Sequence, residues 1–222
     1  MELVLDQGSG RGDKKTGAGI ATAVIQRLPV YQRYLKDLHQ KEVERISSGE
    51  LAAKIGITAS QLRQDLSYFG NFGQQGYGYK VRDLLDEVNK ILGLDHNNYM
   101  VLIGSGNLGR AILSYPGFKE RGFRILAAFD LKITSATVQE GIELRPITEL
   151  ADYLAGHKVD IGVITTPAGS AQAIADQLIA GGIKGIWNFA PIALKTPEHV
   201  VVEDVHISES LLVLSYRLHH QN

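Results

Sequence analysis

The sequence has no cysteine among its 222 residues. Without thiols the chain can form no disulfide, hold no zinc or iron–sulfur cluster through thiolates, and react with no oxidant through a cysteine. If the protein responds to redox state, the response must therefore come from a bound ligand.

Long apolar runs are missing as well. No run approaches the ~20 residues that a helix needs to cross a bilayer, and no basic start followed by an apolar core indicates export. We therefore expect a cytoplasmic protein without a membrane segment. The formal net charge is only -1, so charge by itself neither identifies nor excludes a nucleic-acid partner.

The length suits two small domains, each with its own core. Residues 1–19 hold five glycines among polar residues and show no apolar period, which predicts a disordered tail. Residues 20–94 are predicted to form one domain, and residues 95–205 a second. The remaining residues, 206–222, are predicted to form a C-terminal dimerisation helix.

The first domain is predicted to be a winged helix-turn-helix. A helix starting at Val24 has a helical apolar period, with Pro29 tolerated near its first turn. Ser47 and Glu50 have the spacing of a capping box, and Thr58 with Gln61 repeats it for the next helix. The glycine-rich stretch 70–79 suits the tip of a hairpin, a wing, and an amphipathic helix over 81–92 follows it.

The second half alternates short apolar runs with helical stretches, which favours parallel βαβ units of the Rossmann type. The runs cover residues 99–103, 125–129, 160–165 and 185–189. The fold class is therefore α/β. In the last segment, residues 207–218 are apolar on more than one helical face, which predicts packing against a partner subunit.

A glycine hexad directly follows the first of these strands and opens a helix. It consists of Gly104, Ser105, Gly106, Asn107, Leu108 and Gly109. In a dinucleotide-binding turn the first glycine permits the tight turn, the second admits the pyrophosphate and the third allows close helix packing. Asp130 ends the next strand, where a carboxylate accepts from the adenosine ribose and disfavours a 2′-phosphate. The alternative is a glycine turn that binds no nucleotide.

Catalysis is not expected. About ninety residues follow Asp130, and most are needed to complete the sheet, so no substrate domain fits. No acid–base set suited to a nicotinamide stands out, and the seven histidines are scattered without metal-ligand spacing. The dinucleotide is therefore predicted to act as a signal.

The helix beginning at Ala59 presents a polar face of the kind that enters a major groove. Its residues are Ser60, Gln61, Arg63, Gln64 and Ser67. Arg63 is the expected base reader, because arginine can hold guanine through two hydrogen bonds. Lys54, Lys80 and Arg82 are expected to contact phosphates. A solvated helix face with no partner remains the alternative.

Several of these segments together resemble the Rex family of redox-sensing repressors, which respond to the balance of NADH and NAD. They are 27–35, the Leu-Arg-Gln-Asp-Leu-Ser-Tyr-Phe-Gly segment 62–70, the glycine–tyrosine segment 76–79, the hexad, Tyr115-Pro116-Gly117-Phe118, Thr166-Pro167 and 188–191. The resemblance covers roughly residues 22 to 218. The joining of the 62–70 segment to the wing and the hexad is highly specific.

The resemblance implies a homodimer with domain-swapped C-terminal helices, winged helices on a pseudo-palindromic operator, and NADH as the inducer. It adds Tyr79 and Lys80 to the DNA contacts. Thr165, Thr166, Pro167 and Phe189 would line the nicotinamide pocket with Ala190 and Pro191. A dry, uncharged pocket would favour NADH, because the oxidised ring carries a buried cation.

The resemblance also implies a switch through Arg33 and Tyr115, with Tyr115 close to the cofactor. The family's aspartate at the start of the last helix falls at His206, with Ile207 next, so the switch chemistry is open here. Gln64 and the pair Gln74-Gln75 stand where basic residues are common. Each lost phosphate contact should flatten the salt dependence of binding by ~0.9 in log–log slope.

Two other classes of protein share parts of this pattern. One is a small oxidoreductase with an appended helical domain, which a turnover assay would identify. The other is a nucleotide- or coenzyme-A-binding protein with the same glycine turn, which would respond to coenzyme A.

Overall fold

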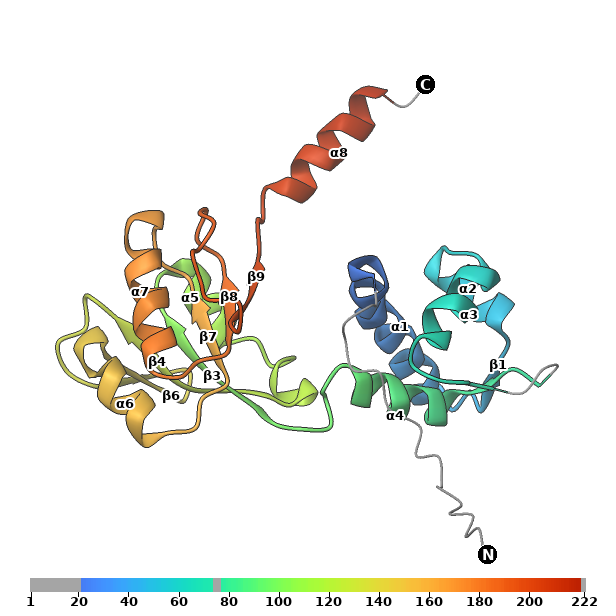
Figure 1. The fold of residues 1–222 in the computed structure, drawn as a ribbon, viewed down its shortest axis with the longest axis horizontal. Helices are drawn as coiled ribbons and strands as arrows, with labels where there is room; N and C mark the ends of the chain where they lie inside the picture. Colours follow the sequence, from blue (N-terminus) through green and yellow to red (C-terminus); the bar gives the residue numbers. More distant parts are fainter. Residues whose placement is uncertain (1–20, 74–76, 221–222) are drawn as a thin grey trace, which may run out of the picture. The chain divides into compact units, whose positions relative to one another are not determined.

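The computed structural model describes residues 21–73 and 77–220 of the chain (Figure 1). The described residues form two compact units that divide between Leu94 and Asp95. The predictions for residues 1–19 and for Gln74 and Gln75 fall outside the described residues. Among the described helices, none is long and apolar enough to cross a membrane.

The first unit is a helical domain with one short ribbon. Its elements are α1 (Thr22–Gln40), β1 (Arg45–Ile46), α2 (Ser48–Ile55), α3 (Ala59–Ser67), β2 (Tyr79–Lys80) and α4 (Val81–Ile91). The apolar side chains predicted from the helical period form its core, with Leu28, Leu35, Leu62 and Val88 almost completely buried. The unit is a winged helix-turn-helix.

Local capping signals set the two short helices. Ser47 Oγ accepts from the Glu50 amide at 3.1 Å, and Glu50 Oε2 accepts from the Ser47 amide at 2.9 Å, so the capping box is confirmed. Gly56 ends α2 with a φ of 83°. Thr58 caps α3 through the Gln61 amide at 3.1 Å, but the Gln61 side chain does not return to the cap. The second box is therefore only half formed.

Two details of the first unit differ from the predictions. Helix α1 begins at Thr22, so Pro29 lies in its interior and not near its first turn. Burial of Leu28 and Tyr31 on either side of the proline offsets the lost backbone hydrogen bond. The strand that pairs with the wing is β1, which precedes α2. Arg45 pairs with Lys80 and Ile46 with Tyr79 in antiparallel register.

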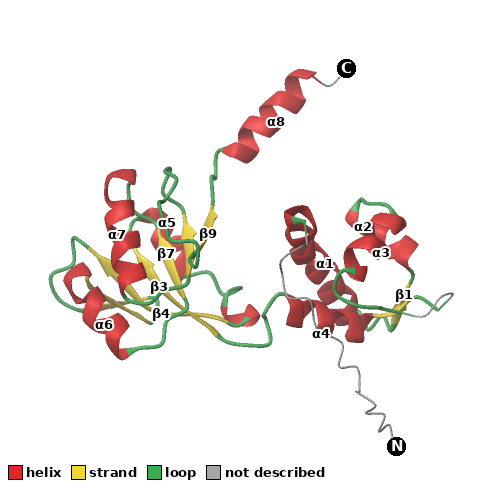
Figure 2. Cartoon of the chain, viewed as in Figure 1, coloured by secondary structure: helices red, strands yellow, loops and turns green. Residues whose placement is uncertain are grey.

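The second unit is built on a β-sheet, drawn in yellow in Figure 2. The sheet has seven strands in the order β5-β6-β4-β3-β7-β8-β9. The strands are β3 (Asn98–Ile103), β4 (Phe123–Asp130), β5 (Thr137–Gln139), β6 (Ile142–Pro146), β7 (Ile161–Ile164), β8 (Gly185–Asn188) and β9 (Val201–Asp204). Among the described strands of this sheet, β5 and β6 pair antiparallel, and all other neighbours pair parallel. Without β5 the order is that of the dinucleotide-binding Rossmann fold.

Helices cover the sheet on both faces. Helices α6 (Leu150–Gly156) and α7 (Ala168–Ala180) pack on one face, and α5 (Asn107–Leu113) packs on the other. Because successive side chains of a strand alternate, Val101 and Ile103 face α6 and α7, whereas Met100 and Leu102 face α5. The chain order reverses between β3 and β7, where a Rossmann fold binds its ligand.

The last helix, α8 (Glu209–His220), differs from the others because all of its residues are exposed. Its apolar side chains Leu211, Leu212, Val213 and Leu214 are between 51% and 69% exposed. Such an apolar surface marks an interaction site in most proteins.

Candidate functional site

The glycine hexad forms a turn between β3 and α5, and each of its three glycines has a different structural role there. Gly104 has a φ of 104°, and an added Cβ would lie 2.9 Å from the Thr165 carbonyl oxygen. A Cβ on Gly109 would lie 1.9 Å from the Gly104 carbonyl oxygen. At Gly106 an added Cβ would meet no described heavy atom within 4 Å. The first and third glycines thus close the turn, and the second leaves its outer side open.

Asp130, at the carboxyl end of β4, is tied to this turn. Its Oδ2 accepts from the amide and the hydroxyl of Ser105 at 2.6 and 2.7 Å, and its Oδ1 accepts from the Lys132 amide at 2.9 Å. Burial by itself would raise the pKa of the Asp130 carboxyl, but these hydrogen bonds outweigh burial and lower it. The carboxylate is therefore ionised at neutral pH.

Two threonines follow β7 opposite the glycine turn. Thr165 Oγ1 lies 2.7 Å from the Gly104 carbonyl oxygen and 3.0 Å from that of Ile103, so its hydroxyl supports the turn. Thr166 Oγ1 is buried and has no hydrogen-bond partner among the described residues. A buried hydroxyl without a partner is costly, and a bound ligand would satisfy it. Together with the open side of Gly106, this hydroxyl leaves a hydrogen-bonding group and room for a polar ligand at the turn.

A row of aromatic side chains connects two further predicted cofactor residues, Tyr115 and Phe189. Tyr115 contacts Phe118 with ring centroids 4.9 Å apart, Phe118 contacts Trp187 at 5.6 Å, and Trp187 contacts Phe189 at 4.6 Å. All three contacts are edge to face, an arrangement that aromatic rings favour. Tyr115 is exposed. The structure thus joins the predicted switch tyrosine to the predicted nicotinamide lining through Phe118 and Trp187, to which no role was assigned from sequence.

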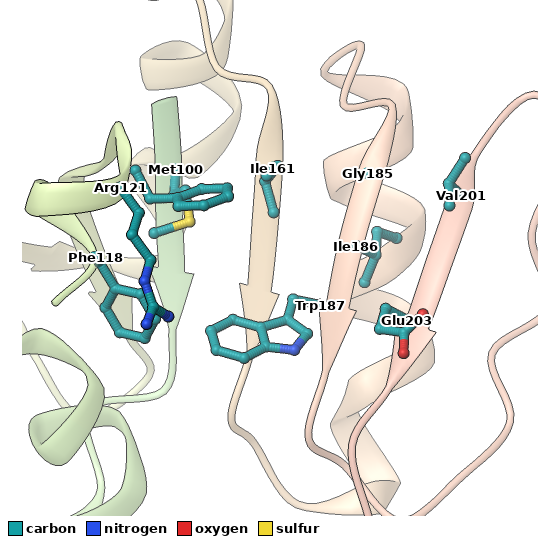
Figure 3. Close-up of a pocket in the computed structure, with 10 residues that line it drawn as sticks. Met100, Phe118, Arg121, Ile161, Gly185, Ile186, Trp187, Val201 and Glu203 are labelled. Atoms are coloured by element: carbon teal, nitrogen blue, oxygen red, sulfur yellow. The ribbon is translucent and has the colours of Figure 1, made fainter. Parts of the chain in front are cut away.

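An apolar groove of about 370 Å³ lies beside this row of aromatic rings, on the α5 face of the sheet (Figure 3). Trp187 and Ile161 project into it from β8 and β7, and Arg121 and Glu203 lie at its sides. The groove was not predicted, because it depends on tertiary packing: among the described α-helices, α5 packs on that face but contributes no residue to the lining. Hydrophobic runs of single strands do not reveal which face stays open.

The polar face of α3 is exposed as predicted at Ser60, Arg63, Gln64 and Ser67. Arg63 Nη1 donates to Ser48 Oγ at 2.9 Å, and Nη2 donates to Ser60 Oγ at 3.2 Å. These weak surface contacts hold the guanidinium on the outer side of the helix, and a stronger acceptor could displace them.

The inner side of α3 carries a buried ionic network. Asp65 is fully buried and accepts from Arg27 Nε and Nη2 at 2.6 and 2.9 Å, from the Tyr31 hydroxyl, and from Gln61 Nε2 at 2.8 Å. Burial opposes ionisation, but the three donors outweigh it and lower the pKa of Asp65. Burial and the hydrogen bond to Asp65 raise the pKa of Tyr31 to about 12.

This network changes the interpretation of Gln61. One of its two amide protons is donated to Asp65, so its second amide proton and its amide oxygen remain for a partner at the surface of α3. The network also fixes α3 against α1, which sequence periodicity could not show because the partners lie 34 to 38 residues apart.

The structure corrects the prediction for Tyr79. Its side chain is 6% exposed and packs in the core of the first unit, where a Cβ on Gly73 would lie 2.9 Å from its ring. Successive side chains of a strand point to opposite sides, so Tyr79 of β2 faces the core whereas Lys80 is exposed. Sequence reasoning also missed Arg45, which pairs across the ribbon with Lys80 and donates to the Tyr77 carbonyl at 3.1 Å. Lys54 and Arg82 are exposed.

The predicted switch residues are all exposed within their own units. The Arg33 guanidinium lies 5.4 Å from the ring centroid of Tyr34. His206 Nε2 lies 4.0 Å from Glu209 Oε1 in the first turn of α8. Among the described residues, no group of three or more His, Asp or Glu side chains could hold a metal ion.

Two family models match the chain. Residues 19–67 match a family described as "Putative DNA-binding protein N-terminus", and residues 95–192 match one described as "CoA binding domain". The first match covers α1 to α3 of the winged helix, and the second covers the Rossmann sheet from β3 to β8. The second description covers the glycine turn, which is the feature shared with coenzyme-A-binding proteins.

Curated relatives are similar over nearly the whole chain. A redox-sensing transcriptional repressor Rex of Clostridium botulinum strain Alaska E43 is 54% identical over 204 residues, covering 91% of this chain and 97% of the relative. The Rex repressor of Clostridium tetani is 50% identical over 211 residues, covering 94% and 99% of the two chains.

Solved structures agree. The crystal structure of RSP with β-NAD⁺ and operator DNA has a TM-score of 0.87 and 47% identity, and the match covers 91% of this chain and 94% of RSP. RSP with β-NADH has a TM-score of 0.83 and 44% identity, covering 91% and 95%. RSP is a Rex-family repressor. From its winged helix and glycine turn, and from this identity over more than nine-tenths of its length, the chain belongs to the Rex family of redox-sensing transcriptional repressors.

Proposed function

We propose that this protein represses transcription by binding operator DNA as a homodimer, and that NADH releases it. The observation that carries the proposal is one chain with a winged helix whose polar α3 face is exposed and a Rossmann unit whose glycine turn is open at Gly106. RSP, with the same fold, was crystallised with NAD⁺ and operator DNA and, separately, with NADH. A regulator rather than an enzyme accounts for both units.

We assign the dinucleotide to the carboxyl edge of the sheet. Gly104 to Gly109 would hold the pyrophosphate, and Asp130 would accept from the adenosine ribose. Thr165, Thr166 and Pro167 would line the far side of the cofactor with Phe189 and Tyr115. The orphaned Thr166 hydroxyl supports this assignment, because a polar ligand group would restore its missing hydrogen bond.

Discrimination between the redox states follows from charge. Oxidised nicotinamide is a cation and reduced nicotinamide is neutral. The candidate lining includes the apolar side chains of Phe189 and Pro167. Burying an unpaired cation is costly. Such a pocket would therefore hold NADH more tightly than NAD.

A gel-shift titration tests the proposal. NADH should lower operator affinity by about 100-fold, a coupling of ~2.7 kcal/mol, and operator DNA should weaken NADH binding by the same factor. NAD should release far less DNA at the same concentration, and coenzyme A none. Equal potency of NADH and NAD would reject redox sensing, and release by coenzyme A would favour the rival nucleotide-binding class. Steady turnover of NADH would identify an oxidoreductase.

We place the DNA-binding domain at residues 20–94, the sensor at 95–205 and the dimerisation segment at 206–222. In the first domain, Ser60, Gln61, Arg63, Gln64 and Ser67 would face the major groove. Lys80 would contact phosphate, as would Lys54, Arg82 and Arg45, which was not predicted from the sequence. Tyr79 is left out because its ring is buried.

Crossed variants separate the two sites. Arg63→Ala should remove specific operator binding and leave NADH affinity unchanged, because the hydrogen bonds of the Arg63 side chain go to Ser48 and Ser60, both in the first unit. Asp130→Ala should weaken NADH binding and leave operator affinity in the absence of cofactor unchanged. Gel shifts and NADH fluorescence read out the two properties. Loss of both properties in either variant would indicate misfolding and would count against the assignment.

The homodimer rests on α8. Ile207, Leu211, Leu214 and Leu218 recur at helical spacing, and each is more than half exposed. A second copy that exchanged α8 would bury this stripe. Arg33, Tyr115 and His206 would then couple cofactor to DNA across the dimer. We also infer that the protein works in the cytoplasm, where operator DNA and the dinucleotide pool are both present.

Charging the stripe should dissociate the dimer. The double variant Leu211→Glu with Leu214→Glu is expected to sediment as a monomer and to lose operator binding, because charged side chains cannot be buried unpaired. The matched control, Ser215→Glu with His219→Glu, adds the same two carboxylates at polar positions of α8 and should remain dimeric. Analytical ultracentrifugation measures both. A dimeric stripe variant would show that α8 is not the interface.

A further inference from the structure

Asn188 ends β8 next to the candidate nicotinamide loop, and its side chain is completely buried. Its Oδ1 accepts from the Ala190 amide at 3.0 Å, and its Nδ2 lies 3.0 Å from the Ile192 carbonyl oxygen and 3.3 Å from that of Ala190. One amide group thus shapes residues 189–192, the segment assigned to the nicotinamide.

The same amide also holds the next strand. Asn188 Nδ2 donates to Asp204 Oδ1 at 2.7 Å, its shortest contact, and the Asn188 carbonyl accepts from the Val205 amide at 2.8 Å. Asp204 is the last residue of the edge strand β9. Only residues 205–208 separate it from the start of α8.

Asn188 has two amide protons for three acceptors, so its contacts compete. A hydrogen bond to a carboxylate is stronger than one to a carbonyl, and a buried amide that loses a partner is penalised. A shift of the 189–192 loop that strengthened one contact would therefore weaken another. Movement of the loop and the hold on Asp204 are linked through a single side chain.

We propose that Asn188 and Asp204 are positioning residues. Through their hydrogen bond, binding of the nicotinamide at the 189–192 loop changes the placement of the segment that leads into α8. The pair is assigned to neither the cofactor site nor the DNA-binding surface of the proposed function. It sets the direction in which the chain leaves β9, and thereby the placement of α8. This inference rests on the proposed function, since it concerns how NADH binding is coupled to release of the operator.

The first test removes only the link. Asp204→Ala deletes the acceptor on β9 and leaves the Ala190 and Ile192 contacts of Asn188 in place. NADH affinity and cofactor-free operator affinity should stay within about two-fold of wild type, whereas the weakening of operator binding by NADH should fall from about 100-fold to about 10-fold or less. The control Glu198→Ala removes a carboxylate at an exposed position before β9. In this variant NADH should weaken operator binding as much as it does in wild type.

The second test exchanges the two groups. Asn188→Asp places two carboxylates against each other and should abolish the weakening of operator binding by NADH. Adding Asp204→Asn restores an amide donor that faces a carboxylate, with the two groups exchanged, and should recover a large part of this weakening. A merely structural role would lower the thermal midpoint and NADH affinity without this rescue.

The outcomes are distinguishable. If wild type shows no NADH-dependent release, the proposed function fails and the pair fails with it. If wild type releases the operator and Asp204→Ala releases it equally, or if the exchange variant couples no better than Asn188→Asp, then the positioning role is wrong and the proposed function stands.

Discussion

Replacing Asp65 with alanine is expected to destabilise the first unit by about 3 kcal/mol, because it leaves Arg27 and Tyr31 without their buried acceptor. This value is at the lower end for a broken buried ion pair, since the Arg27 side chain is 30% exposed and retains access to water. Operator binding should be lost with it, because Asp65 fixes α3 against α1.

Urea unfolding of the full chain can locate this effect. Trp187 is the only tryptophan and lies in the second unit, so its fluorescence reports that unit, whereas circular dichroism reports both. The variant should lose helical signal at lower urea with little change in the tryptophan transition. Asp37→Ala removes an exposed pair with Lys41 and should cost less than about 1 kcal/mol. An equal loss in both variants would refute the role of burial.

The same carboxyl predicts a pH dependence. Folding lowers the pKa of Asp65, so the unfolded chain binds its proton more readily than the folded chain does. Its stabilisation is complete above the unfolded pKa of about 3.9 and is lost as the pH falls through the lower folded pKa. The free energy of unfolding of Asp65→Asn, measured by urea unfolding at a series of pH values, should therefore fall less steeply toward acid pH than that of wild type.

Replacing Gly109 with alanine is expected to weaken NADH binding by at least 10-fold, about 1.4 kcal/mol. The added Cβ would stand 1.9 Å from the Gly104 carbonyl oxygen, which is backbone and cannot rotate away. The turn or α5 must shift, so the variant should also lose about 1–3 kcal/mol of stability.

Gly106→Ala separates the ligand from the fold. Its Cβ would meet no described atom within 4 Å, so stability should not change, but the methyl group would occupy the side assigned to the pyrophosphate. NADH affinity should therefore fall in this variant too. Gly156→Ala, with equally open surroundings on α6, serves as the control and should change neither property. Unchanged NADH affinity in Gly106→Ala would place the ligand elsewhere. Fluorescence titration and thermal melts measure both quantities.

The sequence alone determined the features that depend on short-range chemistry. The capping box at Ser47 and the left-handed exit at Gly56 follow from neighbouring residues, as do the glycine turn after β3 and the amphipathic period of α4. Each is specified within a few residues by backbone conformation or by one local hydrogen bond. For the same reason, both domains and the exposed polar face of α3 were predictable.

The tertiary structure decided what depends on residues far apart in the chain. The Tyr79 side chain is buried because β2 pairs with β1, a two-residue strand too short to predict. Pro29 is tolerated inside α1 because Leu28 and Tyr31 are buried around it. The Asp65 network and the Asn188–Asp204 pair join different elements. Packing and desolvation select such contacts, and neither depends on local sequence spacing.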